Sequence, residues 1–194
     1  MTFPAFPDSI DRNLVFDFFW MFSAFECALK RGDFLKASRN QSPDSGTDNA
    51  DRRCPAHHQQ RKGRAAEADW DKFGRVIDSE FAKLKSPAFL TAVARIKCLS
   101  PQRQINANGK LKWDPVKKET GETDAAYTLH LLRTVRNNLL HGGKYPDGGP
   151  SRIAPVQIAR DKEILGAAVI ILDGCYELHP DIKRLIDDIA RGCA

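Results

Sequence analysis

Apolar residues recur at steps of three and four through most of the chain, and this spacing constrains the fold more than any other feature of the sequence. Residues at such steps lie on one face of an α-helix, whereas residues of a strand change face at every position. The first predicted helix follows Asp8 and Ser9, which are favoured N-cap types, and ends near Gly32 or Lys36. Its buried stripe is predicted to be Leu14, Phe18, Met21, Phe22, Phe25 and Leu29.

Five further helical segments are marked by the same spacing and by capping residues. They are Trp70 to Leu84, Ser86-Pro87 to about Cys98, Thr123 or Asp124 to the stop at Gly142-Gly143, a helix from about Pro155, and a short helix after Pro180. Asn108-Gly109 lies between two short extended runs and favours a tight turn, which predicts a small hairpin lying on the helices. The expected fold is all-α, a bundle of five or six helices with a β-hairpin appendage.

Residues 38–69 differ in composition from the rest of the chain, since they are polar and offer almost nothing to bury. We expect a mobile insertion in a single domain that spans residues 1–194. Between Arg52 and Arg64 this insertion holds basic residues and two histidines but no acid. Such a run can contact phosphates, although charged runs in loops are more often simply solvated.

Composition excludes several classes of protein. Of the 194 residues, 42% are hydrophobic and 28% are charged, so the chain can build a core, and the net charge of +5 permits an anionic partner. Five cysteines are an odd number without a CxxC pair, which favours a reducing compartment over a disulfide framework. The apolar run from Leu14 to Leu29 contains Asp17 and Glu26, so we expect no membrane span and a cytoplasmic protein.

The most informative segment is RTVRNNLLHGGK, residues 133–144, at the C-terminal end of the fourth predicted helix. Asn137 and His141 are four residues apart and share a helix face, and Arg133 lies on the same side as Asn137. Arg136 is about 140° from His141 around an ideal helix, but its long side chain can reach the same cleft.

These residue types suit the cleavage of a phosphodiester. Histidine moves protons near neutral pH, and arginine presents a rigid fork of donors to phosphate oxygens. Asn137 can orient the imidazole or bind a phosphate, the two glycines allow close approach of a ligand, and Lys144 adds a point charge. The group favours metal-free cleavage with the ribose 2′-hydroxyl as nucleophile.

The run Arg136-Asn137-Asn138-Leu139-Leu140-His141 resembles the Arg-polar-x3–5-His motif of the HEPN superfamily, and the following Gly-Gly-Lys is similar to one branch of it. The resemblance implies an all-α homodimer whose two motifs line one cleft. It also implies a metal-independent endoribonuclease that acts as a toxin or in defence, with RNA as partner and an antitoxin or another protein as a possible second partner. Neither a cofactor nor a metal is expected.

Carried over to this chain, the resemblance makes Arg136 the group that stabilises the scissile phosphate and His141 the acid or base. Asn137 is the polar residue of the motif, and Glu26 matches an acidic residue often found on the first helix, which would orient Arg136 or Asn137. Arg133 and Lys144 are supporting residues. Some toxin members have a tyrosine two residues after the histidine, where this chain has Gly143, so mechanisms that use that tyrosine are not expected here.

Other interpretations of the same residues stay open. Arg136 and His141 also fit a helix C-terminus stabilised by cations, and Glu26 also fits a structural ion pair on an apolar face. The chain could then be a non-catalytic RNA- or nucleotide-binding module, or a dimeric interaction module. Cys54-Pro-Ala-His57-His58 lacks a second ligand pair for zinc. His130 could border the cleft, but a surface histidine is the commoner case.

Overall fold

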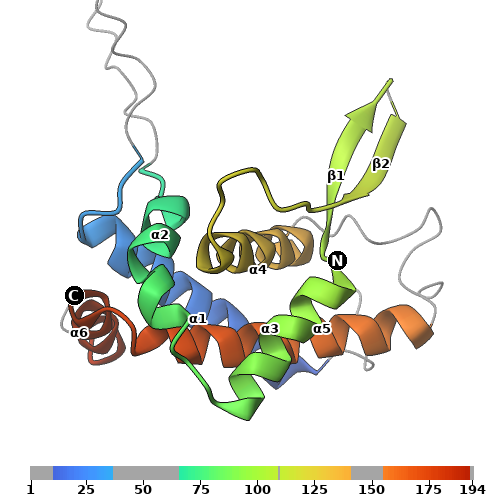
Figure 1. The fold of residues 1–194 in the computed structure, drawn as a ribbon. Helices are drawn as coiled ribbons and strands as arrows, with labels where there is room; N and C mark the ends of the chain where they lie inside the picture. Colours follow the sequence, from blue (N-terminus) through green and yellow to red (C-terminus); the bar gives the residue numbers. More distant parts are fainter. Residues whose placement is uncertain (1–10, 37–65, 109, 141–154, 193–194) are drawn as a thin grey trace, which may run out of the picture.

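The computed structural model of the chain describes residues 11–36, 66–108, 110–140 and 155–192, and these hold six helices and one antiparallel pair of strands (Figure 1). The elements in chain order are α1 (Arg12–Arg31), α2 (Trp70–Phe81), α3 (Pro87–Leu99), β1 (Gln102–Ala107), β2 (Lys110–Pro115), α4 (Asp124–Leu140), α5 (Pro155–Tyr176) and α6 (Pro180–Ala190). The predicted class, a helical bundle with a small hairpin, is confirmed.

Local capping signals fix most of the helix ends. The carboxylate of Asp11 accepts a hydrogen bond from the Leu14 N–H at 3.2 Å, so α1 starts three residues later than an N-cap at Asp8 would give. Residues 8 and 9 themselves lie outside the described residues. The Thr123 hydroxyl accepts from the Ala126 N–H at 3.2 Å, which confirms Thr123 as one of the two caps predicted for α4. Pro87 and Pro180 open α3 and α6, as expected for proline in a first turn.

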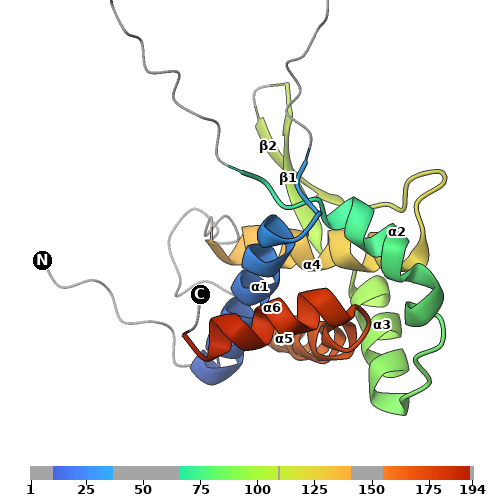
Figure 2. The same ribbon diagram turned by 90° about the vertical axis from the view of Figure 1, so that its left-hand side faces the viewer.

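The core lies where α1 packs on α5 and α6, α2 packs on α4, and α3 packs on α5 (Figures 1 and 2). Aromatic rings join α1 to α2, since Phe22 stacks on Trp70 with ring centroids 4.7 Å apart and Phe25 lies 6.3 Å from Phe73. In the predicted stripe of α1, Leu14 and Met21 are partly buried and pack against the core, and the other members are buried. Trp70 of α2 is a core residue.

Gly74 lies at the closest approach of α2 to α4. A Cβ atom added at this glycine would come within 2.5 Å of the Ala126 Cα and 2.7 Å of the Ala126 nitrogen. Both of these atoms are backbone, so they cannot move aside without moving α4. The absence of a side chain at Gly74 therefore sets the spacing of the two helices.

The hairpin pairs β1 with β2 in the register Arg103↔Asp114 and Ile105↔Lys112, and Asn108 in its turn has a φ of 56°. The strands are those that the sequence predicts, but the expectation that they lie on the helices is wrong. Figures 1 and 2 show the hairpin projecting from the helices, which it meets at its base. The base of the hairpin is anchored to the helices, because Val116, directly after β2, is 2% exposed and packs into the core.

The ends of the polar segment 38–69 are drawn together by the fold. Leu35 and Ala68 form an antiparallel bridge, and the Asp69 N–H donates to the Phe34 carbonyl at 2.7 Å. Ala68 is 4% exposed and Asp69 caps α2, so the last residues of the predicted insertion belong to the core. The sequence boundary missed this because one buried alanine gives no periodic signal. Residues 37–65 lie outside the described residues.

Candidate functional site

Arg136 lies near the end of α4, and its side chain crosses to α1. Its Nη2 atom is 3.5 Å from Glu26 Oε2, its Nη1 atom donates to Asn137 Oδ1 at 3.2 Å, and its guanidinium lies over the Phe22 ring, 5.7 Å from the centroid. About a third of the Arg136 side chain is exposed. The guanidinium is therefore held from three sides and is still reachable from solvent.

Glu26 is bound by two cations. Its Oε1 atom is 3.1 Å from Lys30 Nζ, one helical turn further along α1, and its Oε2 atom faces Arg136. A carboxylate on an apolar helix face needs such partners, and a quarter of the Glu26 side chain remains exposed. Lys30 was not predicted as part of the site, although the Glu26–Lys30 spacing of four residues could have indicated it.

The neighbouring polar residues of α4 turn to other elements. Arg133 Nη1 lies 3.6 Å from Asp71 Oδ1 on α2, so the structure does not bring Arg133 to Glu26. Asn138 Nδ2 donates to the Gln102 carbonyl at 2.7 Å and ties α4 to the base of the hairpin. Of the predicted site residues, the structure brings Glu26, Arg136 and Asn137 together and places Arg133 in a separate ion pair.

The remaining motif residues follow α4. His141, Gly142, Gly143 and Lys144 lie outside the described residues, and so do Cys54, His57 and His58. Since α4 is described through Leu140, His141 is the next residue of the chain, and its place beside Arg136 stays a prediction. His130 is six residues before Arg136, and its Nδ1 atom faces Glu122 Oε1 at 3.5 Å.

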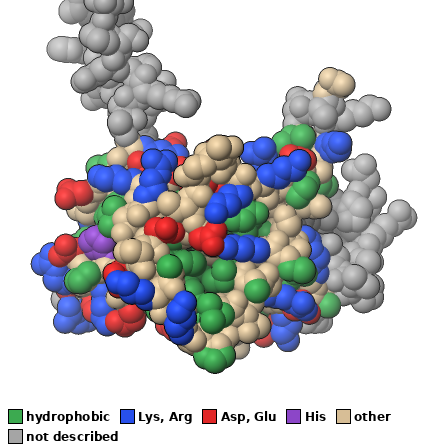
Figure 3. Space-filling view, viewed as in Figure 1, with side chains coloured by type: hydrophobic (Ala, Val, Ile, Leu, Met, Phe, Trp, Pro, Cys, Tyr) green, Lys and Arg blue, Asp and Glu red, His purple; other side chains and the backbone are tan. Residues whose placement is uncertain are grey.

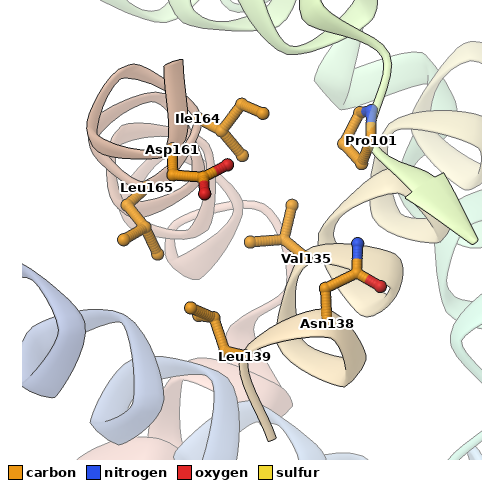
Figure 4. A pocket seen from close by; sticks show the side chains of 7 residues that line it. All are labelled: Pro101, Val135, Asn138, Leu139, Asp161, Ile164 and Leu165. Atoms are coloured by element: carbon orange, nitrogen blue, oxygen red, sulfur yellow. The ribbon is translucent and has the colours of Figure 1, made fainter. Parts of the chain in front are cut away.

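A cavity lies behind the end of α4, on the side toward α5 (Figure 4). Its volume is about 40 Å³, and it is lined by Pro101, Val135, Asn138, Leu139, Asp161, Ile164 and Leu165. That volume has room for about three water molecules and is too small for a nucleotide. Of the seven lining residues that Figure 4 labels, Asn138 and Asp161 bring polar side chains to the cavity.

Charges of both signs are interspersed over the face seen in Figure 3, and no broad single-sign field covers it. Hydrophobic side chains appear in the middle and toward the lower edge of this face. Within the described ranges, no helix combines the length and the apolar character that crossing a membrane requires.

Three comparisons with known proteins were made with this chain. No family model, no curated protein and no solved structure matches it. Inference about function therefore depends on the residues and their geometry.

Proposed function

We propose that the chain is a metal-independent endoribonuclease of the HEPN type. The observation that carries the proposal is the position of Arg136, which is fixed by Glu26 and Asn137, partly exposed, and five residues before His141. A guanidinium held in place without being buried is suited to bind a phosphodiester and to stabilise the charge that builds up on it.

The reaction follows from these groups. The ribose 2′-oxygen attacks the phosphorus and gives up its proton, the bond from phosphorus to the 5′-oxygen breaks, and that oxygen takes a proton. The products are a 2′,3′-cyclic phosphate and a 5′-hydroxyl. Arg136 stabilises the pentavalent phosphate, and His141 acts as the base or as the acid.

We propose further that two copies of the chain form the enzyme. One motif supplies one histidine, whereas the reaction uses both a base and an acid. A symmetric pair of chains places two copies of the motif at one interface.

As a toxin or defence protein the enzyme would need a partner that restrains it. Slower growth of an expressing host, relieved by Arg136→Ala, tests that part of the proposal.

The test of the activity is RNA cleavage by the purified chain in the presence of EDTA. Wild type is expected to cleave, with a cyclic phosphate on the product, and Arg136→Ala and His141→Ala are expected to lose at least 100-fold in rate. His130→Ala removes a histidine of α4, eleven residues earlier in the chain, and serves as the matched control, expected to cleave as wild type does. Activity retained in His141→Ala would refute the mechanism, and RNA binding without cleavage by wild type would favour the non-catalytic binding module.

A further inference from the structure

None of the hairpin side chains that the structure describes belongs to the hydrophobic core. Trp113 on β2 is only partly buried and is not among the side chains that pack against the core. In the described part of the chain the sheet has two strands, so each strand has one unpaired edge. An isolated hairpin is marginally stable in water, and a projecting one is a natural surface for a partner to complete.

The two faces of the hairpin carry different chemistry. The register places Arg103, Ile105, Lys112 and Asp114 on one face, where Arg103 Nη2 lies 3.9 Å from Asp114 Oδ2. Trp113 lies on the other face, since neighbouring residues of a strand alternate. Lys112, an exposed cation, and Trp113, a partly buried indole, are therefore neighbours along β2 that lie on opposite faces of the hairpin.

Basic residues accumulate in and beside the hairpin. Between Arg95 and Lys118 the sequence has seven Lys or Arg residues and one acid. Some of these cations are engaged with the helices, as Lys118 is with Asp124 at 2.6 Å, a contact that raises the pKa of Lys118. Lys112 and Lys117 are exposed. Arg95, Lys97 and Arg103 are also in ion pairs, and Glu119 follows Lys118 directly. Among the described side chains of this stretch, Lys112 and Lys117 are therefore the exposed cations left to meet an anionic ligand.

The base of the hairpin is fixed to the turn of α4 that carries the candidate site. Asn138 holds the Gln102 carbonyl on one side of α4, while Arg136 faces α1 on the other. On the other flank, Arg160 Nη2 donates to the Leu99 carbonyl at 2.6 Å, and the Tyr127 hydroxyl donates to the Val116 carbonyl at 3.1 Å. The hairpin base and Arg136 are thus both attached to the last turns of α4, on different sides of that helix.

We propose that the hairpin is an arm that binds an unpaired RNA strand along the outer edge of β2. The RNA strand wraps this edge, so that Lys112 contacts a phosphate on one face and a base stacks on Trp113 on the other. A cation combined with an aromatic ring binds single strands without sequence readout. A protein partner fits less well, because none of the large exposed hydrophobic side chains of the described chain lies on the hairpin. The choice of RNA rests on the proposed function, whereas the position of the binding edge does not.

The test is the affinity of His141→Ala, which removes the proposed acid or base, for a labelled single-stranded RNA and for DNA of the same sequence. Lys112→Glu is expected to weaken RNA binding at least five-fold and to lower the salt dependence by about 0.7 per lost phosphate contact. Trp113→Ala is expected to weaken binding at least five-fold, and Trp113→Phe to restore most of it. Arg184→Glu, an exposed charge reversal on α6, is the matched control and leaves the affinity unchanged.

A second variant separates charge from folding. Exchanging Arg103 and Asp114 keeps both the net charge and the ion pair, so it is expected to bind RNA as the parent does. Unchanged affinity in Lys112→Glu and Trp113→Ala overturns the arm, and so does loss of affinity that merely follows dissociation of a dimer. RNA binding through the arm without any cleavage by wild type refutes the nuclease and leaves the arm standing. Equal binding of DNA replaces RNA with single-stranded nucleic acid in general.

Discussion

Replacing Gly74 with alanine should destabilise the protein, although alanine favours helices. The new methyl group would lie 2.5 Å from the Ala126 Cα, so α2 and α4 must separate by about 1 Å. Overpacking of this kind costs about 1–3 kcal/mol and more where backbone must move, against a gain in helix propensity of about 1 kcal/mol. We expect a net loss of about 1–2 kcal/mol, which lowers Tm by about 2–8 °C for a chain of this size.

Gly166 is the matched control. It also lies inside a helix, α5, but nothing comes within 4 Å of an added Cβ. Gly166→Ala should therefore raise the free energy of unfolding by about 0.5–1 kcal/mol. Urea unfolding followed by circular dichroism measures both variants. If Gly74→Ala were as stable as Gly166→Ala, the close approach of α2 to α4 would be wrong.

Three further changes test the site and the core. Glu26→Gln should lower kcat about five-fold without raising KM, because Arg136 loses an ion pair worth about 1 kcal/mol. Glu163→Gln, which loses an exposed ion pair with Arg95, should leave kcat unchanged. Equal kcat values of the two variants would remove Glu26 as a positioning residue. Arg160→Ala should cost about 1–3 kcal/mol in urea unfolding, since two carbonyls at the end of α3 lose a charged donor, and wild-type stability would contradict this. Burial raises the pKa of Cys175 to about 12, so above pH 9 the unfolded chain loses the thiol proton before the folded chain does, and the free energy of unfolding falls by up to about 1.4 kcal/mol per pH unit. Cys175→Ala should lack this contribution, and identical pH curves of wild type and variant would refute it.

The helices were predictable because their signals are local. The stripe from Phe18 to Leu29, the cap at Thr123 and the first-turn prolines Pro87 and Pro180 depend on residues a few positions apart, and the structure places helices there. The direction of the hairpin was not predictable, because it depends on contacts at the hairpin base with elements distant in the sequence. The burial of Ala68 was missed for the same reason, since its bridge partner Leu35 lies across the polar segment.

In the candidate site, too, the local features were predictable and the contacts between distant residues were not. The motif around Arg136 can be found in the sequence, but its pairing with Glu26 joins residues 110 positions apart, and only the resemblance suggested it. Arg133 was grouped with Asn137 from helical spacing alone. Arg133 pairs with Asp71 instead, because α2 packs on that side of α4. The spacing of residues within α4 cannot show which neighbouring helix lies there.

The bridge between Leu35 and Ala68 has a consequence for engineering the chain. The Lys36 N–H donates to the Glu67 carbonyl at 3.0 Å, so the two described residues that border residues 37–66 lie side by side. The entropy of closing a loop grows only by about 0.6 kcal/mol for each doubling of its length. Shortening residues 37–66 to a tight turn, or grafting a reporter domain between them, should leave the packing of the helices intact.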